Sequence, residues 1–262
     1  MRELEELLGQ ALFQRQPARG LALTRFGLEK LPAARALAAQ LAAFASGADA
    51  AGEPAGEVVF GYFATLGPQY LPGILAMIAR RYPRVAVQPV EADLDGLDRL
   101  LAAGRVELAL SYDVRPGAST VFERVAELAP YAVLPARHPL AKRPAVSARE
   151  LAAEPFVLID LPSSRDFLLS VFRSEGIEPR IAHRALSLEM VYGMVANGLG
   201  VSVLVTRPAS DRAYDGRRVE RVPLAQSLLR QNVVLAWPAR VAPTAPARAL
   251  AECVRHCVGG AR

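Results

Sequence analysis

The sequence predicts a two-lobe α/β protein preceded by a short, separate N-terminal region. Its 262 residues are enough for two units of about 100–150 residues each. From Glu57 onward, apolar runs of strand length alternate with amphipathic segments of helix length, and the alternation restarts near Phe156. Strands that alternate with helices usually pair in parallel and are joined by crossover helices. The repeated pattern therefore indicates two α/β lobes.

Composition narrows the class of protein. Hydrophobic residues make up 52% of the chain and charged residues 22%, which is typical of a folded globular protein. The 31 Lys and Arg exceed the 26 Asp and Glu only slightly, so the charge permits an anionic partner without requiring one. No stretch approaches the roughly 18 uncharged apolar residues of a membrane span. The acidic start does not resemble a secretory signal. We expect a cytoplasmic protein that does not associate with membranes.

The first 56 residues are predicted to form small elements and a linker. Residues 2–9 fit the end of a helix that stops at Gly9. Two short apolar runs at 11–13 and 21–24 flank a basic turn, which predicts a β-hairpin. Thr24 is expected to cap a following helix, and residues 46–56 are expected to be a flexible linker.

The helix after Thr24 has a heptad-like apolar seam. Its apolar residues recur at spacings of three and four: Leu31, Ala34, Ala38, Leu41 and Ala45. Such a seam is typical of a helix that pairs with another helix. We therefore expect a dimerisation helix, with a kink or break at Pro32.

Two sets of strands and helices follow. The first set comprises predicted strands at 58–63, 85–90 and 106–112, with helices at 65–81 and 94–103. The second comprises strands at 156–160, 181–186 and 201–205, with helices at 163–175 and 189–197. A final strand at 233–237 precedes a C-terminal helix from Pro246. We expect the chain to cross between the lobes at 131–135 and at the final strand, which makes a cleft between the lobes the natural ligand site.

Short motifs distributed over the whole chain occur in a recognisable order. They are residues 2–9, 12–15 and 20–24, then Leu71-Pro72, Tyr82-Pro83, residues 104–110, His138-Pro139-Leu140 and residues 195–201. In this order they resemble the LysR-type transcriptional regulators. The resemblance implies a two-lobe, periplasmic-binding-protein-like effector domain preceded by a winged helix-turn-helix and a dimerisation helix. It also implies a homodimer or homotetramer that binds promoter DNA and a small organic anion, with no cofactor and no enzymatic activity.

The resemblance also divides the chain into regions. Residues 1–24 are expected to be a remnant of the winged helix-turn-helix, 25–56 the dimerisation helix and linker, 57–132 with 236–262 lobe 1, and 133–235 lobe 2. Family members begin with two further helices, so we expect the helix-turn-helix to be missing here, through a start codon assigned too late or a genuine truncation. DNA contact would then fall to Arg2, Arg15 and Arg19, which reach phosphates and not bases.

The resemblance places the effector between the lobes, partly at two helix N-termini. Thr65, Leu66 and Gly67 begin the first helix of lobe 1, and Ser163, Ser164 and Arg165 begin the first helix of lobe 2. Free backbone N–H groups at a helix N-terminus suit a carboxylate, and an arginine can pair with an anion. The alternatives are that Thr65 is only an N-cap, and that the second segment is a Ser-x-x-Asp cap with Arg165 in water.

Two strand ends complete the predicted effector site. Tyr112 follows a buried strand of lobe 1, at the edge where ligands of open α/β sheets bind, or it fills the hinge. Ser202 is a polar residue in an otherwise apolar strand of lobe 2, which suggests a polar task.

Other chemistries fit less well. Cys253, His256 and Cys257 lack a second ligand pair for a metal, and the acidic run at Glu91, Asp93, Asp95 and Asp98 fits a solvated helix start. No Gly-x-Ser-x-Gly elbow is present, so we expect neither a metal nor an enzyme. The alternative function is a cytoplasmic protein of the same fold that binds or sequesters a small molecule and has no DNA role. Residues 2–41 count against it, because a solute receptor needs neither a wing nor a dimer helix.

Overall fold

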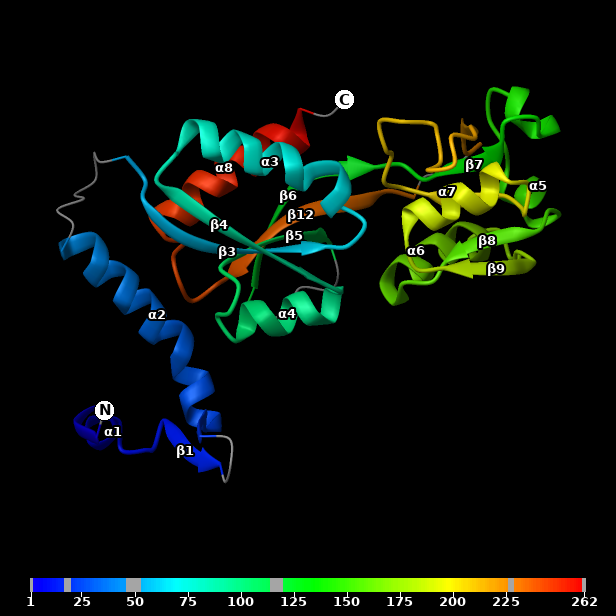
Figure 1. Ribbon diagram of the computed structural model, residues 1–262. Coiled ribbons are helices and arrows are strands. Elements are labelled where there is room, and N and C mark those ends of the chain that lie inside the picture. The colour runs from blue at the N-terminus through cyan, green and yellow to red at the C-terminus, as the bar shows by residue number, and fades with distance from the viewer. Residues whose placement is uncertain (1, 17–19, 46–52, 114–119, 226–228, 261–262) are drawn as a thin grey trace. The chain divides into compact units, whose positions relative to one another are not determined.

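The computed structural model describes residues 2–16, 20–45, 53–113, 120–225 and 229–260, and its architecture is mixed α/β (Figure 1). Contacts between residues divide the chain into two compact units. Unit 1 comprises Met1–Tyr62, Gly73–Glu123 and Leu235–Arg262, and unit 2 comprises Phe63–Pro72 and Arg124–Val234. Two units agree with the predicted two-lobe class, while the lobe bounds expected from the sequence stay a prediction.

The N-terminal part of unit 1 has the predicted helix end and hairpin. Helix α1 (Arg2–Leu8) ends at Gly9, whose φ of +69° lies in the left-handed region that favours glycine. Strand β1 (Phe13–Gln16) pairs antiparallel with β2 (Gly20–Leu23). The hairpin is longer than predicted, because residues 14–16 of the expected turn continue the ladder opposite residues 20–22.

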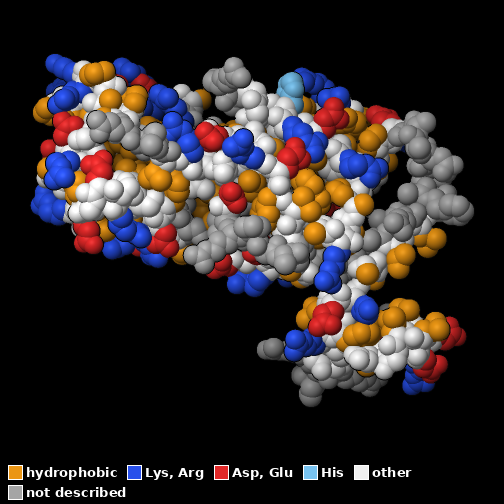
Figure 2. Space-filling view, turned by 180° about the vertical axis from the view of Figure 1, so that it is seen from behind, with side chains coloured by type: hydrophobic (Ala, Val, Ile, Leu, Met, Phe, Trp, Pro, Cys, Tyr) orange, Lys and Arg blue, Asp and Glu red, His pale blue; other side chains and the backbone are white. Residues whose placement is uncertain are grey.

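Helix α2 (Arg25–Ala45) begins where the sequence predicts. The hydroxyl of Thr24 accepts a hydrogen bond from the backbone N–H of Gly27 at 3.0 Å, which confirms Thr24 as the cap. The helix continues past Pro32, so a break there is wrong, while a kink stays a prediction. Its Leu28, Leu37 and Leu41 are exposed, and Figure 2 shows hydrophobic side chains along this helix. Residues 46–52 of the expected linker lie outside the described residues.

Unit 1 contains a five-stranded sheet in the order β4-β3-β5-β12-β6. The strand bounds are Gly56–Phe63 for β3, Val85–Ala92 for β4, Leu108–Tyr112 for β5, Thr120–Leu128 for β6 and Gln231–Pro238 for β12. Figure 1 shows helix α4 (Leu94–Ala102) on one side of this sheet and helices α3 (Gly67–Arg81) and α8 (Ala245–Gly259) on the other. The chain changes unit at four places: 62/63 within β3, 72/73 within α3, 123/124 within β6 and 234/235 within β12.

Unit 2 contains two small sheets. In the first, β7 (Tyr131–Pro135) lies between β10 (Ser202–Leu204) and β11 (Val219–Pro223) and is antiparallel to both. The expected crossing at 131–135 is thus the central strand of a sheet within unit 2. In the second, β8 (Phe156–Ile159) and β9 (Ile181–Ala185) are parallel. The helical segments are η1 (Pro139–Lys142), α5 (Ala148–Ala152), α6 (Pro162–Arg173) and α7 (Leu188–Ala196).

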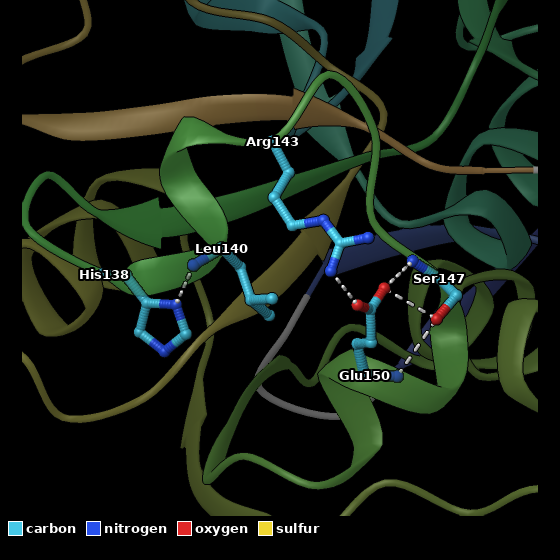
Figure 3. A network of polar contacts seen from close by, with 5 residues as sticks. All are labelled: His138, Leu140, Arg143, Ser147 and Glu150. Atoms are coloured by element: carbon cyan, nitrogen blue, oxygen red, sulfur yellow. Dashed lines mark hydrogen bonds and ion pairs between the residues drawn. The ribbon is translucent and has the colours of Figure 1, made fainter.

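A polar network fixes the segment before and within α5 (Figure 3). Ser147 and Glu150 form a capping box, in which the Ser147 hydroxyl accepts from the Glu150 N–H at 3.2 Å and the Glu150 carboxylate accepts from the Ser147 N–H at 2.9 Å. Arg143 pairs with the same carboxylate at 2.8 Å, and His138 Nδ1 accepts from the Leu140 N–H at 3.2 Å. The His-Pro-Leu motif of the sequence therefore forms a structural turn.

Each unit has an apolar core of its own. In unit 1, Phe60 and Ile74 are fully buried. In unit 2, the rings of Phe156 and Phe172 meet edge to face, with centroids 5.2 Å apart. Among the described helices, none is long and apolar enough to cross a lipid bilayer.

Candidate functional site

The predicted contact segment at α3 is deeply buried. Helix α3 begins at Gly67, and the carbonyl of Leu66 accepts from the Tyr70 N–H at 3.1 Å. Leu66 therefore occupies the N-cap position, and Thr65 precedes it by one residue. Thr65 is only 5% exposed and Leu66 is fully buried. The alternative in which Thr65 is the N-cap of α3 is wrong by one residue, because the first helical hydrogen bond is accepted by the carbonyl of Leu66.

Gln69, which the sequence did not single out, lies in the first turn of α3. Its side-chain carbonyl oxygen is buried and has no hydrogen-bond partner among the described residues. Buried polar atoms are nearly always hydrogen-bonded to protein or water, so this oxygen calls for a partner that the described residues do not supply. A half-turn of the amide presents its NH2 group at the same place, so the side chain serves either an acceptor or a donor. A glutamine carries no sequence signal for such a role.

The second helix N-terminus, that of α6, has no side-chain cap. Its N-cap residue is Leu161, followed by Pro162 at the first helical position. The first backbone N–H of α6 that donates within the helix is that of Arg165, which donates to the Leu161 carbonyl at 2.7 Å. The backbone N–H groups of Ser163 and Ser164 thus belong to the orphan donors of a helix start. The Ser-x-x-Asp cap is wrong, because an apolar residue holds the cap position.

Arg165 is engaged by carboxylates of the protein itself. Its Nη1 lies 3.0 Å from Oδ1 of Asp160, and its Nε lies 3.6 Å from Asp166. Arg184 binds the other oxygen of Asp160 at 3.1 Å. The hydrogen bond from Arg165 is the main reason why the pKa of Asp160 is lowered, although partial desolvation opposes it. Arg165 is therefore already paired within the protein. The alternative that leaves its charge in water alone is wrong, and an anionic ligand would meet an arginine that has carboxylate partners.

Ser202 and Tyr112 are both buried at strand positions. The Ser202 hydroxyl is fully buried and donates to the Val157 carbonyl at 2.7 Å, so the polar task of Ser202 includes joining β10 to β8. Tyr112 ends β5 and is 4% exposed.

The predicted effector residues do not all belong to the same unit. Unit 2 contains Thr65, Leu66, Gly67, Ser163, Ser164, Arg165 and Ser202. Tyr112 belongs to unit 1. The side chain of Ser163 lies outside the described atoms. Which of these residues contact an effector stays a prediction.

The predicted DNA contacts are described only in part. Arg2 is the first residue of α1 and is exposed. Arg15 lies on β1, with its side chain outside the described atoms, and Arg19 lies outside the described residues.

The structure shows the surroundings of Asp93 and of the two cysteines, which the sequence offers as metal ligands. Among the described residues, no group of three or more His, Cys, Asp or Glu could hold a metal ion. Asp93 caps α4 by accepting from the Gly96 N–H at 2.7 Å, which confirms a helix start there. Cys253 is fully buried, and burial raises the pKa of both Cys253 and Cys257.

Comparisons with known proteins identify the family. Residues 51–257 match the LysR substrate binding domain. The HTH-type transcriptional regulator TtuA of Agrobacterium vitis is 30% identical over 249 residues, which cover 90% of this chain and 80% of that protein. The crystal structure of HinK, a LysR family transcriptional regulator from Pseudomonas aeruginosa, is 34% identical with a TM-score of 0.76, and the match covers 99% of this chain and 87% of that one.

A third match is confined to one domain. The C-terminal domain of a probable LysR family transcriptional regulator from Rhodococcus sp. RHA1 is 32% identical with a TM-score of 0.74, and the match covers 77% of this chain and 99% of that one. These matches confirm the predicted fold. The chain belongs to the LysR family of transcriptional regulators, with a LysR substrate binding domain at residues 51–257.

Proposed function

We propose that the chain is a cytoplasmic, DNA-binding transcription regulator whose substrate binding domain responds to a small organic carboxylate. TtuA and HinK are transcriptional regulators by name, which supports the regulatory role and promoter DNA as a partner. The ligand changes regulation only if it binds two arrangements of the protein with different affinity. We propose that these arrangements differ in how the subunits of a homodimer or homotetramer are held.

One observation supports a carboxylate as the class of ligand. Helix α6 begins at an apolar N-cap, Leu161, so no side chain of the cap residue satisfies its first N–H groups. The partial positive charge of a helix N-terminus favours an anion at this place. The buried amide of Gln69 at the start of α3 supports a polar ligand that supplies a hydrogen-bond partner as well. Thr65, Leu66, Gly67, Tyr112 and Ser202 are proposed as the remaining contacts.

A response to hydrogen peroxide is a second candidate, because some relatives are named as hydrogen peroxide-inducible genes activators. We take oxidation of a thiol as the chemistry that such a response would use. The probable hydrogen peroxide-inducible genes activator of Mycobacterium avium is 33% identical over 227 residues, which cover 85% of this chain and 71% of that protein. Thiol oxidation requires a thiolate. The chain has two cysteines, and burial raises the pKa of both. Ligand binding is therefore the better proposal.

A matched pair of substitutions tests the carboxylate site. Ser164→Glu places a negative charge in the first turn of α6, where helices favour acidic residues, so the variant should fold. Ser164→Gln has the same size and no charge. The full-length protein is titrated calorimetrically with a panel of aliphatic and aromatic carboxylates. We expect Ser164→Glu to weaken binding about fivefold or more through repulsion between like charges, while Ser164→Gln stays within about twofold of the parent.

Two outcomes would overturn the proposal. One is a carboxylate that binds the parent and both variants equally while melting temperatures show all three folded. The other is a panel in which no carboxylate binds the parent.

A further inference from the structure

Three sulfur atoms meet where helices α3 and α8 of unit 1 pack together, and the proposed function does not use them. They belong to Met77 on α3 and to the two cysteines of the chain, Cys253 and Cys257, on α8. We call these three residues the sulfur cluster. Along the sequence the cysteines lack further ligands for a metal, but the fold supplies a third sulfur from a residue 180 positions before Cys257.

The packing of α3 against α8 fixes the cluster. The two helices lie on the same side of the five-stranded sheet (Figure 1). Arg81 Nη2 lies 2.7 Å from Oε1 of Glu252, and the Tyr82 hydroxyl donates to Oε2 of Glu252 at 2.7 Å. About one turn earlier on α3 and one turn later on α8, Sγ of Cys257 lies 4.0 Å from Sδ of Met77. The helices therefore run antiparallel here, and polar contacts hold them together one turn away from the sulfurs.

The two cysteines share one face of α8. Cys253 and Cys257 are four residues apart, and side chains at this spacing lie on the same face of a helix. Burial is the main reason why the pKa of Cys253 is raised, and the charge of Cys257 adds to it, so the two thiols are within electrostatic reach of each other. Two ligands at i and i+4 of a helix can hold one metal ion. His256 is exposed, and adjacent helix positions do not face each other, so it does not complete the set.

The depth and the spacing of the sulfurs suit a shared ion. Cys253 is fully buried, while Cys257 and Met77 are half-buried, so the cluster extends from the core toward the surface. Bonds from thiolate sulfur to a metal ion are about 2.3 Å long, so two sulfurs of a planar three-coordinate site lie about 4.0 Å apart. The distance between Met77 and Cys257 already has this value.

We propose that the sulfur cluster binds one soft monovalent cation of the Cu(I) type through the thiolates of Cys253 and Cys257 and the thioether of Met77. Thiolate and thioether ligands select Cu(I) over harder ions. Zn(II) fits less well, because its structural sites have four ligands drawn from thiolate, imidazole and carboxylate. Both thiols release their protons to solvent when the ion binds, since a coordinating thiol is deprotonated outright, and no electron is transferred.

The probe is Cu(I) itself. The full chain is added without oxygen to the coloured bicinchoninate complex of Cu(I), and the loss of colour measures transfer of the ion to the protein. We expect the parent to take up one Cu(I) per chain. Cys253→Ala and Cys257→Ala each remove a thiolate and should weaken binding about hundredfold or more. Met77→Leu keeps the approximate size of the side chain, removes the sulfur and should weaken binding about tenfold.

Met190→Leu is the matched control, because Met190 is an exposed methionine on α7 of unit 2. It should bind Cu(I) as the parent does. X-ray absorption at the copper edge of the loaded parent should show sulfur ligands at about 2.3 Å. Cys253 lies in the core, so melting temperatures establish which variants fold. If Cys253→Ala does not fold, Cys257→Ala and Met77→Leu still decide, since both residues are half-buried.

Three results would overturn the proposal. They are a parent that leaves Cu(I) with the chelator, a folded Met77→Leu or Cys257→Ala variant with the affinity of the parent, and displacement of Cu(I) by an equal concentration of Zn(II). The inference does not depend on the carboxylate site. Ser164→Glu should bind Cu(I) as the parent does, so failure here and failure of the proposed function are distinguishable.

Discussion

Arg165 donates a hydrogen bond across 3.0 Å to Asp160, the residue directly after β8, so the charge of Arg165 is paired within the protein. Arg184 shares the same carboxylate at 3.1 Å. Two arginines thus share the Asp160 carboxylate near the start of α6, and Arg165 also lies 3.6 Å from Asp166. An anionic effector at this place would compete with these carboxylates for the two arginines.

Asp160→Asn should therefore strengthen the binding of a carboxylate effector. The substitution keeps the shape of the side chain and removes the carboxylate that Arg165 and Arg184 share. Arg184 can then pair with the ligand, and Arg165 keeps only Asp166 as a competing carboxylate. We expect a gain of about two- to fivefold, in line with the modest strength of exposed ion pairs. Calorimetric titration of parent and variant with the same carboxylate measures it.

Glu175→Gln is the matched control, because Glu175 is an exposed acid near the end of α6. It changes the net charge equally and should leave the affinity unchanged. A folded Asp160→Asn variant with weaker binding would show that Asp160 positions Arg165 for the ligand and does not compete with it.

Glu123 and Arg255 connect β6 to α8 through two hydrogen bonds of 2.7 and 2.8 Å. The bond from Arg255 is the main reason why the pKa of Glu123 is lowered. A lowered carboxyl pKa contributes stability above the ordinary glutamate pKa of about 4.3, and this contribution is lost as the pH falls through the lowered value. Glu123→Gln should therefore reduce the free energy of unfolding by up to about 1 kcal/mol at pH 7, as a two-bond pair at the surface does.

Urea unfolding at neutral and at acidic pH checks this prediction. The difference between parent and Glu123→Gln should shrink as the pH falls below 4, on the order of the ordinary carboxyl pKa. The control is Glu127→Gln, because Glu127 has only longer ion-pair contacts, of 3.3 Å to Arg124 and 3.7 Å to Arg230, and its loss should reduce the free energy of unfolding less. A difference that does not change with pH would attribute the effect to packing and not to charge.

The sequence predicts most elements of the fold, and strand β6 and helix α5 are among those it misses. Strand β6 contains Glu123, Arg124 and Glu127 among its apolar residues, and both of its faces are partly exposed, so no alternation of period two appears. Its neighbour in the sheet is β12, about a hundred residues later in the chain, which no local pattern reveals. The short helix α5 did have a signal, the Ser147 to Glu150 capping box.

The candidate site is predicted less completely than the fold. The position of a helix start can be read from the sequence to within one or two residues, and Thr65 shows the size of that error. The partners of Arg165 and Ser202 depend on which strands lie side by side, since Asp160 follows β8 and Val157 lies within it. Residue types alone did not show that both polar groups were already paired.

Position 200 requires glycine for two reasons, its backbone conformation and the close approach of Pro155. Its φ is +150°, and a β-carbon there would lie 2.3 Å from the carbonyl oxygen of Pro155, which accepts the N–H of Val201 at 2.8 Å. Gly200→Ala should therefore lower the free energy of unfolding by several kcal/mol, on the order of 3, because the backbone at Pro155 or at residue 200 must shift. Gly198→Ala is the control, since Gly198 has a φ of +78° and nothing within 4 Å of a β-carbon. It should cost about 1–2 kcal/mol from strain alone. Equal costs in chemical denaturation would contradict the close approach.

The exposed leucines of α2 predict an assembly in which this helix is covered. Leu41 of the seam and Leu37 beside it are 67% and 65% exposed, and residues four apart lie on one face of a helix. Large apolar side chains left in water are unfavourable by about 25 cal/mol per Å² of apolar surface, so a second copy of the seam stabilises them. We expect light scattering after size exclusion to show a dimer or larger assembly at tens of micromolar, on the order expected for a weak dimer.

The double substitution Leu37→Glu with Leu41→Glu should lower that mass, because the like charges of two facing seams repel and the apolar contact is lost. Leu21→Glu is the matched control: Leu21 is 69% exposed but lies on β2, away from the seam, so its variant should keep the mass of the parent. If the double variant remains a smaller but definite oligomer, other surfaces assemble it as well, as a homotetramer requires. A parent that is monomeric at these concentrations, or a double variant with unchanged mass, would show that α2 does not pair.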